Sequence, residues 1–570
     1  MLALSFRTKS ALGAACLVLA SAACSAVSGN AGQPEQSTPG GGNASIPGGG
    51  ASGTSSPPGG GGAAVCDPNA SLAPARVWRI TDEEYVNVVS QVFGVTMPAE
   101  VTEPVVTGAE FSNTSEHAQV NKSIAVAYQL AAHQAAVTAV TAHLKTFLPC
   151  DAQAPSDACV NSFIRNRVAR AFSRPIADAE AASLLALYKS SGTDGASTGV
   201  RLVIEAALQA PSFLYRTELG DAPAGGPTAK FNLTPHELAT AVSFALTDSV
   251  PDDTLWETAE DGSIARPEVL RAQVDRLLAL PTTQANVSHL AGFWLGVEQI
   301  NAAPKDSTYP MYTPQVQADL YNSTKLFVRD VFANGTVNDL LSSTKMYMNE
   351  SLASIYKIPG VTGTDLKPVN TTLPERSMGI LSQPGIQAAT GHPYGTDVVH
   401  RGLYLYYAFA CGVAIPPPPD GATAANAALP KDSTERDRAA YRAANTCKAC
   451  HANFDPLGLA TERYDGIGRY SETNPHGAID TSSTVINLNE LNGPITGLPD
   501  LVARLKTGRR VPDCAATNLS KFVLGREVKQ DTSCALSTIK DKFAATGSFK
   551  DYYRAILTSP GFVTRDPAAK

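Results

Sequence analysis

The sequence has no excess of positive charge and none of the short motifs that mark common hydrolases. Its 570 residues contain 45 Lys and Arg against 52 Asp and Glu, a formal net charge of −7. Such a chain lacks the basic footprint of a nucleic-acid-binding protein. It also lacks a P-loop, a GxSxG motif and an HExxH motif. Nucleotide hydrolysis, serine-esterase chemistry and zincin proteolysis are therefore not the first hypotheses.

The N-terminal apolar stretch at 11–24 is too short for a comfortable membrane span. Arg7 and Lys9 precede it and small residues end it, which is typical of a secretory signal. Cys24 follows a lipoprotein-like box in which Ser21 stands where Leu is usual. We expect lipidation at Cys24, with simple cleavage as the alternative. The protein is therefore predicted to be exported to the periplasmic or cell-surface face of a bacterial membrane.

Beyond this segment, a linker and a helical body are predicted. Residues 25–65 form a Gly/Ser/Pro-rich tract that cannot bury enough apolar surface to fold. In the body, Thr81-x-x-Glu84 and Thr234-x-x-Glu237 are capping-box patterns that precede apolar residues at helical spacing. Further helices are expected over 117–149, 162–190, 198–218, 265–280, 314–334 and 498–507, with an extended segment over 478–490.

CKACH at 447–451 has the spacing of a c-type haem attachment site. Two sulfurs three residues apart lie on one side of a helical turn, and the adjacent His451 can bind the iron as proximal ligand. A zinc site would need further ligands, and no second CxxC exists. The motif could also hold redox thiols or a structural disulfide. We predict one covalent haem c held by Cys447, Cys450 and His451, with a nearby backbone carbonyl accepting the His451 Nδ1–H.

The cysteine count fits an oxidising compartment, where disulfides persist. Of ten cysteines, Cys16 lies in the signal, Cys24 is the predicted anchor and two belong to the haem motif, which leaves six. Six cysteines allow many pairings, so the sequence does not fix the connectivity. The predicted disulfides are Cys150–Cys159, Cys514–Cys534 and, by elimination, Cys66–Cys411.

No methionine follows Met378, although small cytochromes c usually take a Met ligand downstream of the attachment motif. His392 or His400 is the candidate distal ligand, and a structural role for each is the alternative. Two strong axial ligands favour electron transfer, whereas an open position allows peroxide or O₂ chemistry. Tyr394 and Arg401 lie close to these histidines in sequence and would suit a peroxidatic pocket.

Taken together, several stretches give the chain a family resemblance. It resembles the large exported planctomycete-type cytochrome-c-like proteins that are built from serial domains of unknown function. The resemblance covers about residues 76–565 and implies an exported, mostly helical protein with a haem-like domain near the C-terminus. It implies no substrate. The stretches that carry it are RVWRITDEEYVNVVSQVFG, RAFSRPIADAE, ALQAPSFLYRTELG, LTPHELATAVSFALTDSVPDDTLWETAEDG, GILSQPGIQAATG, VVHRGLYLYYAFACGVAIPPPPD, CKACHANFDPLGLATERYDGIGRY, KFVLGREV and YYRAILTSPGFV.

The predicted fold class is mainly α, a multi-domain helical body with a C-terminal cytochrome-c-like haem domain and little β structure. The first two segments are the signal or lipoprotein segment and the disordered linker, and the rest are structured domains. The predicted boundaries are 1–24 and 25–65 for these segments, 66–149, 150–225 and 226–368 for three helical domains, 369–477 for the haem domain, and 478–570 for a C-terminal helical domain.

Three functional hypotheses follow. The first is an exported, lipid-anchored c-type cytochrome-like protein that exchanges electrons with a redox protein or a small molecule. The second is a haem-dependent peroxidase or oxidase, so the sequence leaves open whether the protein is an enzyme. The third is a non-haem surface-binding protein in which CKACH is only structural. A nucleic-acid partner is not expected, and the membrane is reached through the anchor at Cys24.

Overall fold

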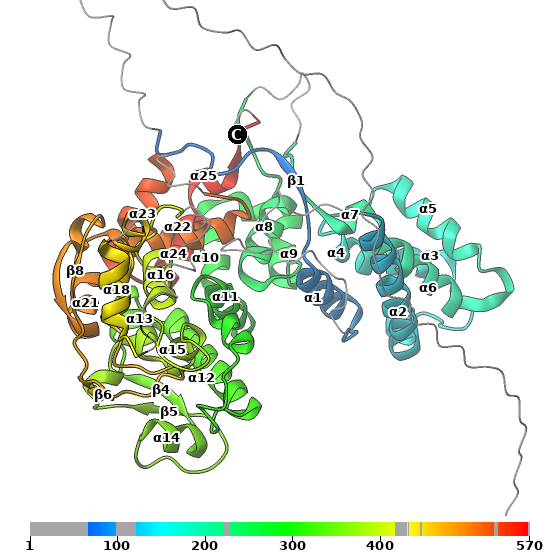
Figure 1. The fold of residues 1–570 in the computed structure, drawn as a ribbon. Helices are drawn as coiled ribbons and strands as arrows, with labels where there is room; N and C mark the ends of the chain where they lie inside the picture. Colours follow the sequence, from blue (N-terminus) through cyan, green and yellow to red (C-terminus); the bar gives the residue numbers. More distant parts are fainter. Residues whose placement is uncertain are drawn as a thin grey trace, which may run out of the picture. The chain divides into compact units, whose positions relative to one another are not determined.

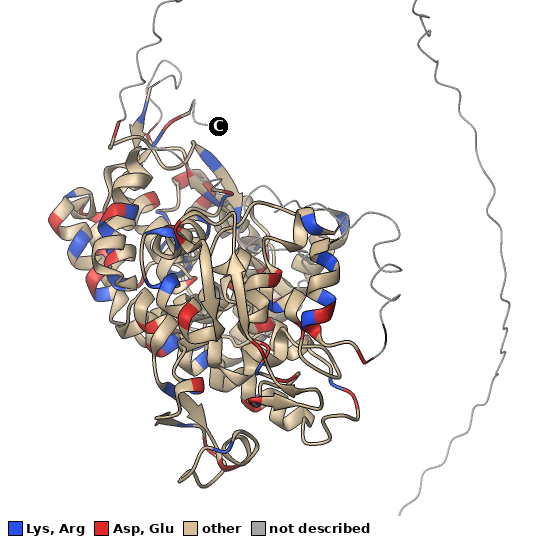
Figure 2. Cartoon of the chain, turned by 60° about the vertical axis from the view of Figure 1, so that its left-hand side comes forward, with Lys and Arg blue, Asp and Glu red and all other residues tan. Residues whose placement is uncertain are grey.

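The computed structural model describes residues 67–97, 121–221, 229–415, 430, 432–444, 447–528 and 534–567, and these are mainly helical (Figure 1). This confirms the prediction of a mainly α protein with little β structure. The predicted signal, Cys24, the linker and Cys66 lie outside the described residues. Charges of both signs are interspersed over the helices (Figure 2), as the small net charge leads one to expect. None of the helices in the described ranges is long and apolar enough to cross a membrane.

The first part of the body packs around its own hydrophobic core, which draws its side chains from residues 80–214 and from Phe244, Val250 and Trp256. The capping box predicted for Thr81 and Glu84 is present and starts α1. The elements of this part are β1 (Arg76–Arg79), α1 (Asp82–Phe93), α2 (Lys122–Phe147), α3 (Asp157–Phe163), the π-helix η2 (Ile164–Val168), α4 (Ala169–Ala171), α5 (Asp178–Lys189), α6 (Gly195–Ala207), α7 (Pro211–Leu214) and β2 (Tyr215–Glu218).

Two of the predicted helices in this part are wrong in extent. The helix predicted over 162–190 is interrupted after Ala171, where Ser173 takes a left-handed backbone with φ 54°. The helix predicted over 198–218 ends at Ala207, and Tyr215–Glu218 forms a strand that pairs antiparallel with β1. The pairing joins segments more than a hundred residues apart, so local helical spacing could not reveal it.

The second part packs around a larger core. Thr234 caps α8 through the predicted capping box with Glu237. Its elements are β3 (Phe231–Asn232), α8 (Pro235–Thr247), α9 (Asp253–Glu260), α10 (Pro267–Leu278), α11 (Pro281–Trp294), α12 (Pro314–Asn334), α13 (Val337–Ser342), β4 (Lys345–Met348), α14 (Glu350–Tyr356), β5 (Lys367–Asn370), α15 (Pro384–Ala389), α16 (Val398–Ala408), α18 (Glu435–Ala444), α19 (Lys448–His451), α20 (Asp455–Leu459), β6 (Thr473–Asn474), β7 (Gly477–Ala478), β8 (Ser482–Val485), β9 (Gly493–Thr496), α21 (Gly497–Leu505), α22 (Arg510–Leu524), α23 (Cys534–Thr546), α24 (Phe549–Leu557), α25 (Pro560–Val563) and β10 (Thr564–Arg565).

Strands contribute little to this architecture. Within the described ranges every sheet has two antiparallel strands, and β8 falls inside the segment predicted to be extended. The larger core is continuous: it includes buried side chains from Leu233 through Phe454 to Phe562. The predicted boundaries at 368/369 and 477/478 therefore do not separate hydrophobic cores, and the domain division itself stays a prediction.

A buried carboxylate ties the first strands to the last strand. Glu218 on β2 lies 2.7 Å from Arg76 Nε and 2.7 Å from Arg565 Nε, and Glu218 and Arg565 are almost completely buried. Burial raises the pKa of Glu218, but the two guanidinium groups outweigh it and hold this pKa well below its ordinary value. The charged carboxylate thus bridges β1, β2 and β10.

Candidate functional site

The CKACH stretch forms one turn of helix. Cys447 is the N-cap of α19, and its carbonyl oxygen accepts the backbone N–H groups of Cys450 at 3.2 Å and His451 at 3.0 Å. Both thiols are free and half-buried, so the two cysteines do not form a disulfide with each other. The motif therefore has the local geometry that the sequence predicts, and its sulfurs remain available for another bond.

The ring of His451 is held by a buried carboxylate. Its Nδ1 atom lies 3.0 Å from Asp455 Oδ1, and the other oxygen, Oδ2, accepts the Arg442 Nε–H at 2.7 Å. Asp455 and Arg442 are 5% and 4% exposed, and the His451 side chain is 22% exposed. Because one ring nitrogen is engaged, Nε2 is the atom left for a metal.

This partner corrects the prediction that a backbone carbonyl accepts the His451 Nδ1–H. The acceptor is the Asp455 carboxylate, four residues further along the chain. A carboxylate at i+4 from the histidine was visible in FDPLG and is the signal that could have found it, since residues four apart meet across a helical turn. Pro456 stands in the first turn of α20, so it begins a second helix close behind α19.

The helix behind the motif is fixed by two glycines. A Cβ on Gly458 would stand 1.8 Å from the carbonyl oxygen of Val398, and one on Gly402 would stand 2.2 Å from that of Phe454. Only glycine permits such an approach of two backbones. Val398 also forms a small buried cluster with Ala439 of α18 and Leu459 of α20. Helices α16, α18 and α20 therefore support the attachment motif.

The two predicted distal histidines meet at one carboxylate. Asp397, which caps α16, contacts His400 Nδ1 through Oδ2, and the same oxygen lies 3.2 Å from His392 Nε2. The His392 ring also stacks on Tyr394, with centroids 5.1 Å apart. Val398 and Gly402 face α20, and His400 lies midway between them in sequence, which puts it on the opposite face of α16. The distal assignment of His392 or His400 stays a prediction.

Arg401 does not join these histidines in a polar pocket. It is 1% exposed and donates to the carbonyl oxygens of Gln387 at 3.0 Å and Asp465 at 2.6 Å. Burial lowers its pKa to about 10. Lys305 has a similar role, since its Nζ donates to the carbonyl oxygens of Ala388 and Gly391 at 2.8 Å each. Lys305 thus holds the segment from Ala388 to Gly391, and Arg401 joins Gln387 to Asp465 in the segment that follows the CKACH motif.

One predicted disulfide is confirmed and two are wrong. Cys150 and Cys159 are joined, as expected for neighbours across a short loop. Cys411 is bonded to Cys514, with Cα atoms 5.4 Å apart. This bond overturns the pairings Cys514–Cys534 and Cys66–Cys411, and Cys534 forms a different disulfide. The disulfides fit an extracellular or periplasmic protein.

In the described part of the chain, no three His, Cys, Asp or Glu side chains lie together in a way that could hold a metal ion. A structural zinc usually takes four such ligands.

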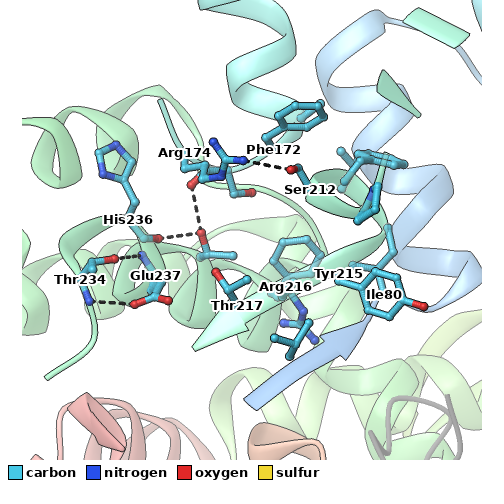
Figure 3. Close-up of a pocket in the computed structure, with 18 residues that line it drawn as sticks. Ile80, Phe172, Arg174, Ser212, Tyr215, Arg216, Thr217, Thr234, His236 and Glu237 are labelled. Carbon is cyan, nitrogen blue, oxygen red and sulfur yellow. Dashed lines mark hydrogen bonds between the residues drawn. The ribbon is translucent and has the colours of Figure 1, made fainter. Parts of the chain in front are cut away.

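Among the cavities that the described residues form away from this motif, two flank the start and the end of α8. The smaller, of about 420 Å³, is lined by Phe172, Arg174, Ser212 and the start of α8 (Figure 3). Arg174 donates to Ser212, and the Thr240 hydroxyl donates to the His236 carbonyl oxygen. Among the described residues, His236 Nε2 and Arg216 Nε are buried without a hydrogen-bond partner. The larger, of about 880 Å³, lies between α1, the α8–α9 turn and the start of α11.

Comparison with known proteins gives three family matches. Residues 159–218 match PSD5, a protein of unknown function (DUF1595), and residues 233–358 match PSD4, a protein of unknown function (DUF1592). Residues 377–474, which contain the CKACH motif, match PSCyt3, a protein of unknown function (DUF1588). No curated protein and no solved structure matches the chain significantly. The name PSCyt3 points to a cytochrome-like domain around the motif.

Proposed function

We propose, from the premise that this chain belongs to the planctomycete-type family of cytochrome-c-like serial-domain proteins, that it binds one covalent haem and transfers electrons outside the cytoplasm. One observation carries the proposal. Two free cysteines lie on one helical turn, and the adjacent His451 has its Nδ1 engaged by the buried Asp455. These are the residue types and the order that a c-type attachment site requires.

The residues present fit a haem c. Cys447 and Cys450 would supply the two sulfurs of the thioether bonds, and His451 Nε2 would supply the proximal nitrogen. The haem, when bound, supplies an iron that cycles between Fe(II) and Fe(III). A redox protein or a small molecule would donate and accept the electrons, and the predicted lipid anchor at Cys24 would hold the protein at the membrane.

The chain itself tunes the proximal ligand. Asp455 accepts the His451 Nδ1–H, which fixes the tautomer and the ring orientation and increases the basicity of Nε2. Arg442 donates to the other oxygen of the same carboxylate and fixes its orientation toward His451. When a haem is bound, the hydrogen-bond chain from Arg442 through Asp455 to His451 would favour the more positive iron and so lower the potential of the site.

The test is a pyridine haemochrome spectrum of the chain exported by a host that attaches c-type haem. The wild type should show a reduced α-band at the c-type position, and Cys447→Ala/Cys450→Ala should lose it. Cys150→Ala/Cys159→Ala is the matched control, because it also removes two cysteines but should retain the haem. A folded wild type without haem would overturn the proposal and favour the surface-binding hypothesis.

The sixth ligand separates the electron carrier from a peroxidase or oxidase. A low-spin spectrum that His392→Ala or His400→Ala converts to high spin would assign the distal ligand. A high-spin wild-type spectrum that shifts on adding cyanide would favour the enzyme.

A further inference from the structure

Helix α2 exposes apolar side chains along its outer side. Its inner side, which includes Tyr128 and Ala132, is buried in the core of the first part, where α2 packs against α6 (Figure 1). On the outer side Leu130 is 66% exposed, Val126 is 47% exposed and Val137 is 40% exposed. Among the described residues, no other helix exposes more than one large hydrophobic side chain.

The three exposed side chains form one stripe. They occupy positions i, i+4 and i+11, so they lie within an arc of about 40° and span about 16 Å along the helix axis. His133 lies on the same stripe, and its Nδ1 contacts Glu205 of α6 at 2.7 Å, which ties the ring to α6. A helix with apolar side chains on its outer as well as its inner side is normally covered on both. The stripe therefore indicates a contact with something outside the described chain.

Charges mark the two ends of α2 and are missing between them. No Asp, Glu, Lys or Arg occurs in residues 123–144. Lys122 and Lys145 at the two ends are exposed, and neither has an ion-pair partner among the described residues. Such lysines can pair with lipid phosphates, while aliphatic side chains between them enter the boundary between headgroups and acyl chains. The charge pattern thus complements the surface of a bilayer.

The stripe is too small to hold a protein partner by itself. A strip of helix surface about 16 Å long and 10 Å wide offers about 200 Å². A stable protein–protein interface buries about 800 Å² on each side. A second copy of the chain would need most of its contact elsewhere, whereas a bilayer deforms around a single ridge.

The predicted anchor places this face within reach of a membrane. Residues 25–66 separate Cys24 from Asp67, the first described residue. A Gly/Ser-rich chain of this length has an end-to-end distance of about 35 Å. A tether of this kind raises the effective concentration of the body at the bilayer, so a weak contact by one helix face is enough to orient it.

From these observations we propose that the outer face of α2 docks on the surface of a bilayer that contains anionic lipid. Val126, Leu130 and Val137 enter the boundary between headgroups and acyl chains, and the two terminal lysines contact the phosphates. The first part of the body then rests on the membrane. This inference adds a second contact to the proposed anchor and is independent of the haem.

The experiment measures contact of α2 with lipid by fluorescence quenching. Leu130→Trp is introduced into the exported full chain, which is titrated with vesicles of phosphatidylcholine and phosphatidylglycerol whose acyl chains carry bromine, a quencher that acts only at close contact. The fluorescence of this variant should fall relative to vesicles without bromine. Val413→Trp is the matched control, because Val413 is 72% exposed but lies outside α2, and its fluorescence should stay unchanged. The native tryptophans are buried or half-buried.

A charged stripe should bind lipid less well. In the Leu130→Trp background, Val126→Glu/Val137→Glu should weaken vesicle binding by about tenfold or more, since two aliphatic side chains no longer leave water. Glutamate is a good helix former and both positions are exposed, so the melting temperature should not change. Val413→Glu/Ile486→Glu adds the same charge at exposed aliphatic positions outside α2 and should bind as before.

The lysines are tested separately. Lys122→Gln/Lys145→Gln should reduce the preference for phosphatidylglycerol over phosphatidylcholine by about tenfold, because each lysine near an anionic surface contributes to binding. An unchanged preference would overturn the assignment of these lysines to lipid phosphates.

The outcomes are separable from the fate of the anchor. Flotation of the vesicles on a density gradient reports the anchor, so a chain that floats while Leu130→Trp stays unquenched keeps the anchor and overturns the docking face. The proposal is also wrong if Val126→Glu/Val137→Glu binds vesicles as tightly as its control. It is equally wrong if the chain forms a dimer without lipid that this variant dissociates, since a second copy would then cover the stripe.

Discussion

Gly458 lies directly against Val398: a Cβ on this glycine would stand 1.8 Å from the Val398 carbonyl oxygen. The contact joins the helix that follows the CKACH motif to α16. Since the opposing atom is backbone, it cannot rotate away as a side chain would. The close approach of α16 and α20 therefore depends on the absence of a side chain at this position.

Gly458→Ala should destabilise the protein by about 2 kcal/mol or more, because the added methyl forces the two backbones apart. The measurement is the midpoint of urea unfolding together with the haem content. Gly395→Ala is the matched control, since a Cβ there would meet nothing within 4 Å. Equal stability of the two variants would show that α16 and α20 do not pack as described.

Asp455→Asn should raise the midpoint potential of the haem and slow electron transfer to a small acceptor about tenfold, because a neutral amide no longer increases the basicity of His451. Redox titration of the α-band measures the change. Asp437→Asn, at an exposed position in the first turn of α18, should leave the potential unchanged. An unchanged potential in Asp455→Asn would mean that His451 is not the proximal ligand or that Asp455 does not hold it.

Removing the Cys411–Cys514 disulfide should cost about 2–5 kcal/mol, because the bond closes a long loop whose ends must otherwise be brought together. The sequence separation is 103 residues for Cys411–Cys514 and 9 residues for Cys150–Cys159. The Cys411→Ala/Cys514→Ala variant should therefore lose more unfolding free energy than the Cys150→Ala/Cys159→Ala variant. Denaturant unfolding compares the two. Non-reducing peptide mapping checks the connectivity directly, and a Cys514–Cys534 peptide would contradict it.

Glu462→Gln should change how stability depends on pH. Burial raises the pKa of Glu462 to about 7, from an ordinary value of 4.5. The folded wild type therefore keeps a proton that the unfolded chain releases, and its unfolding free energy falls as the pH rises from about 4.5 to 7. The Gln variant has no carboxyl group to titrate and so lacks this loss. Between pH 4.5 and 7, its unfolding free energy should therefore increase by about 2–3 kcal/mol relative to that of the wild type.

Thermal or urea unfolding at several pH values measures this difference. Glu472→Gln is the control, since Glu472 is exposed. A difference between Glu462→Gln and the wild type that stays constant from pH 4.5 to 7 would show that Glu462 titrates normally.

Features set by neighbouring residues were predictable. The capping boxes at Thr81 and Thr234 need only a carboxylate three residues further on. Cys150 and Cys159 are close along the chain, and the CKACH turn needs only helical backbone between its ends. In each case the interaction closes within a few residues, so its entropic cost is small and distant parts of the fold do not compete for it.

The tertiary structure decided the rest. Tyr215–Glu218 became a strand because β1 pairs with it, and Cys411 met Cys514 because α16 and α22 are brought together by packing across a hundred residues. Likewise, packing placed both His392 and His400 in contact with the carboxylate of Asp397. The sequence alone determined the mainly helical class and the helical turn of the CKACH motif. Only the packing of distant segments decided which side chains surround it, because burial and long-range contacts outweigh local preference.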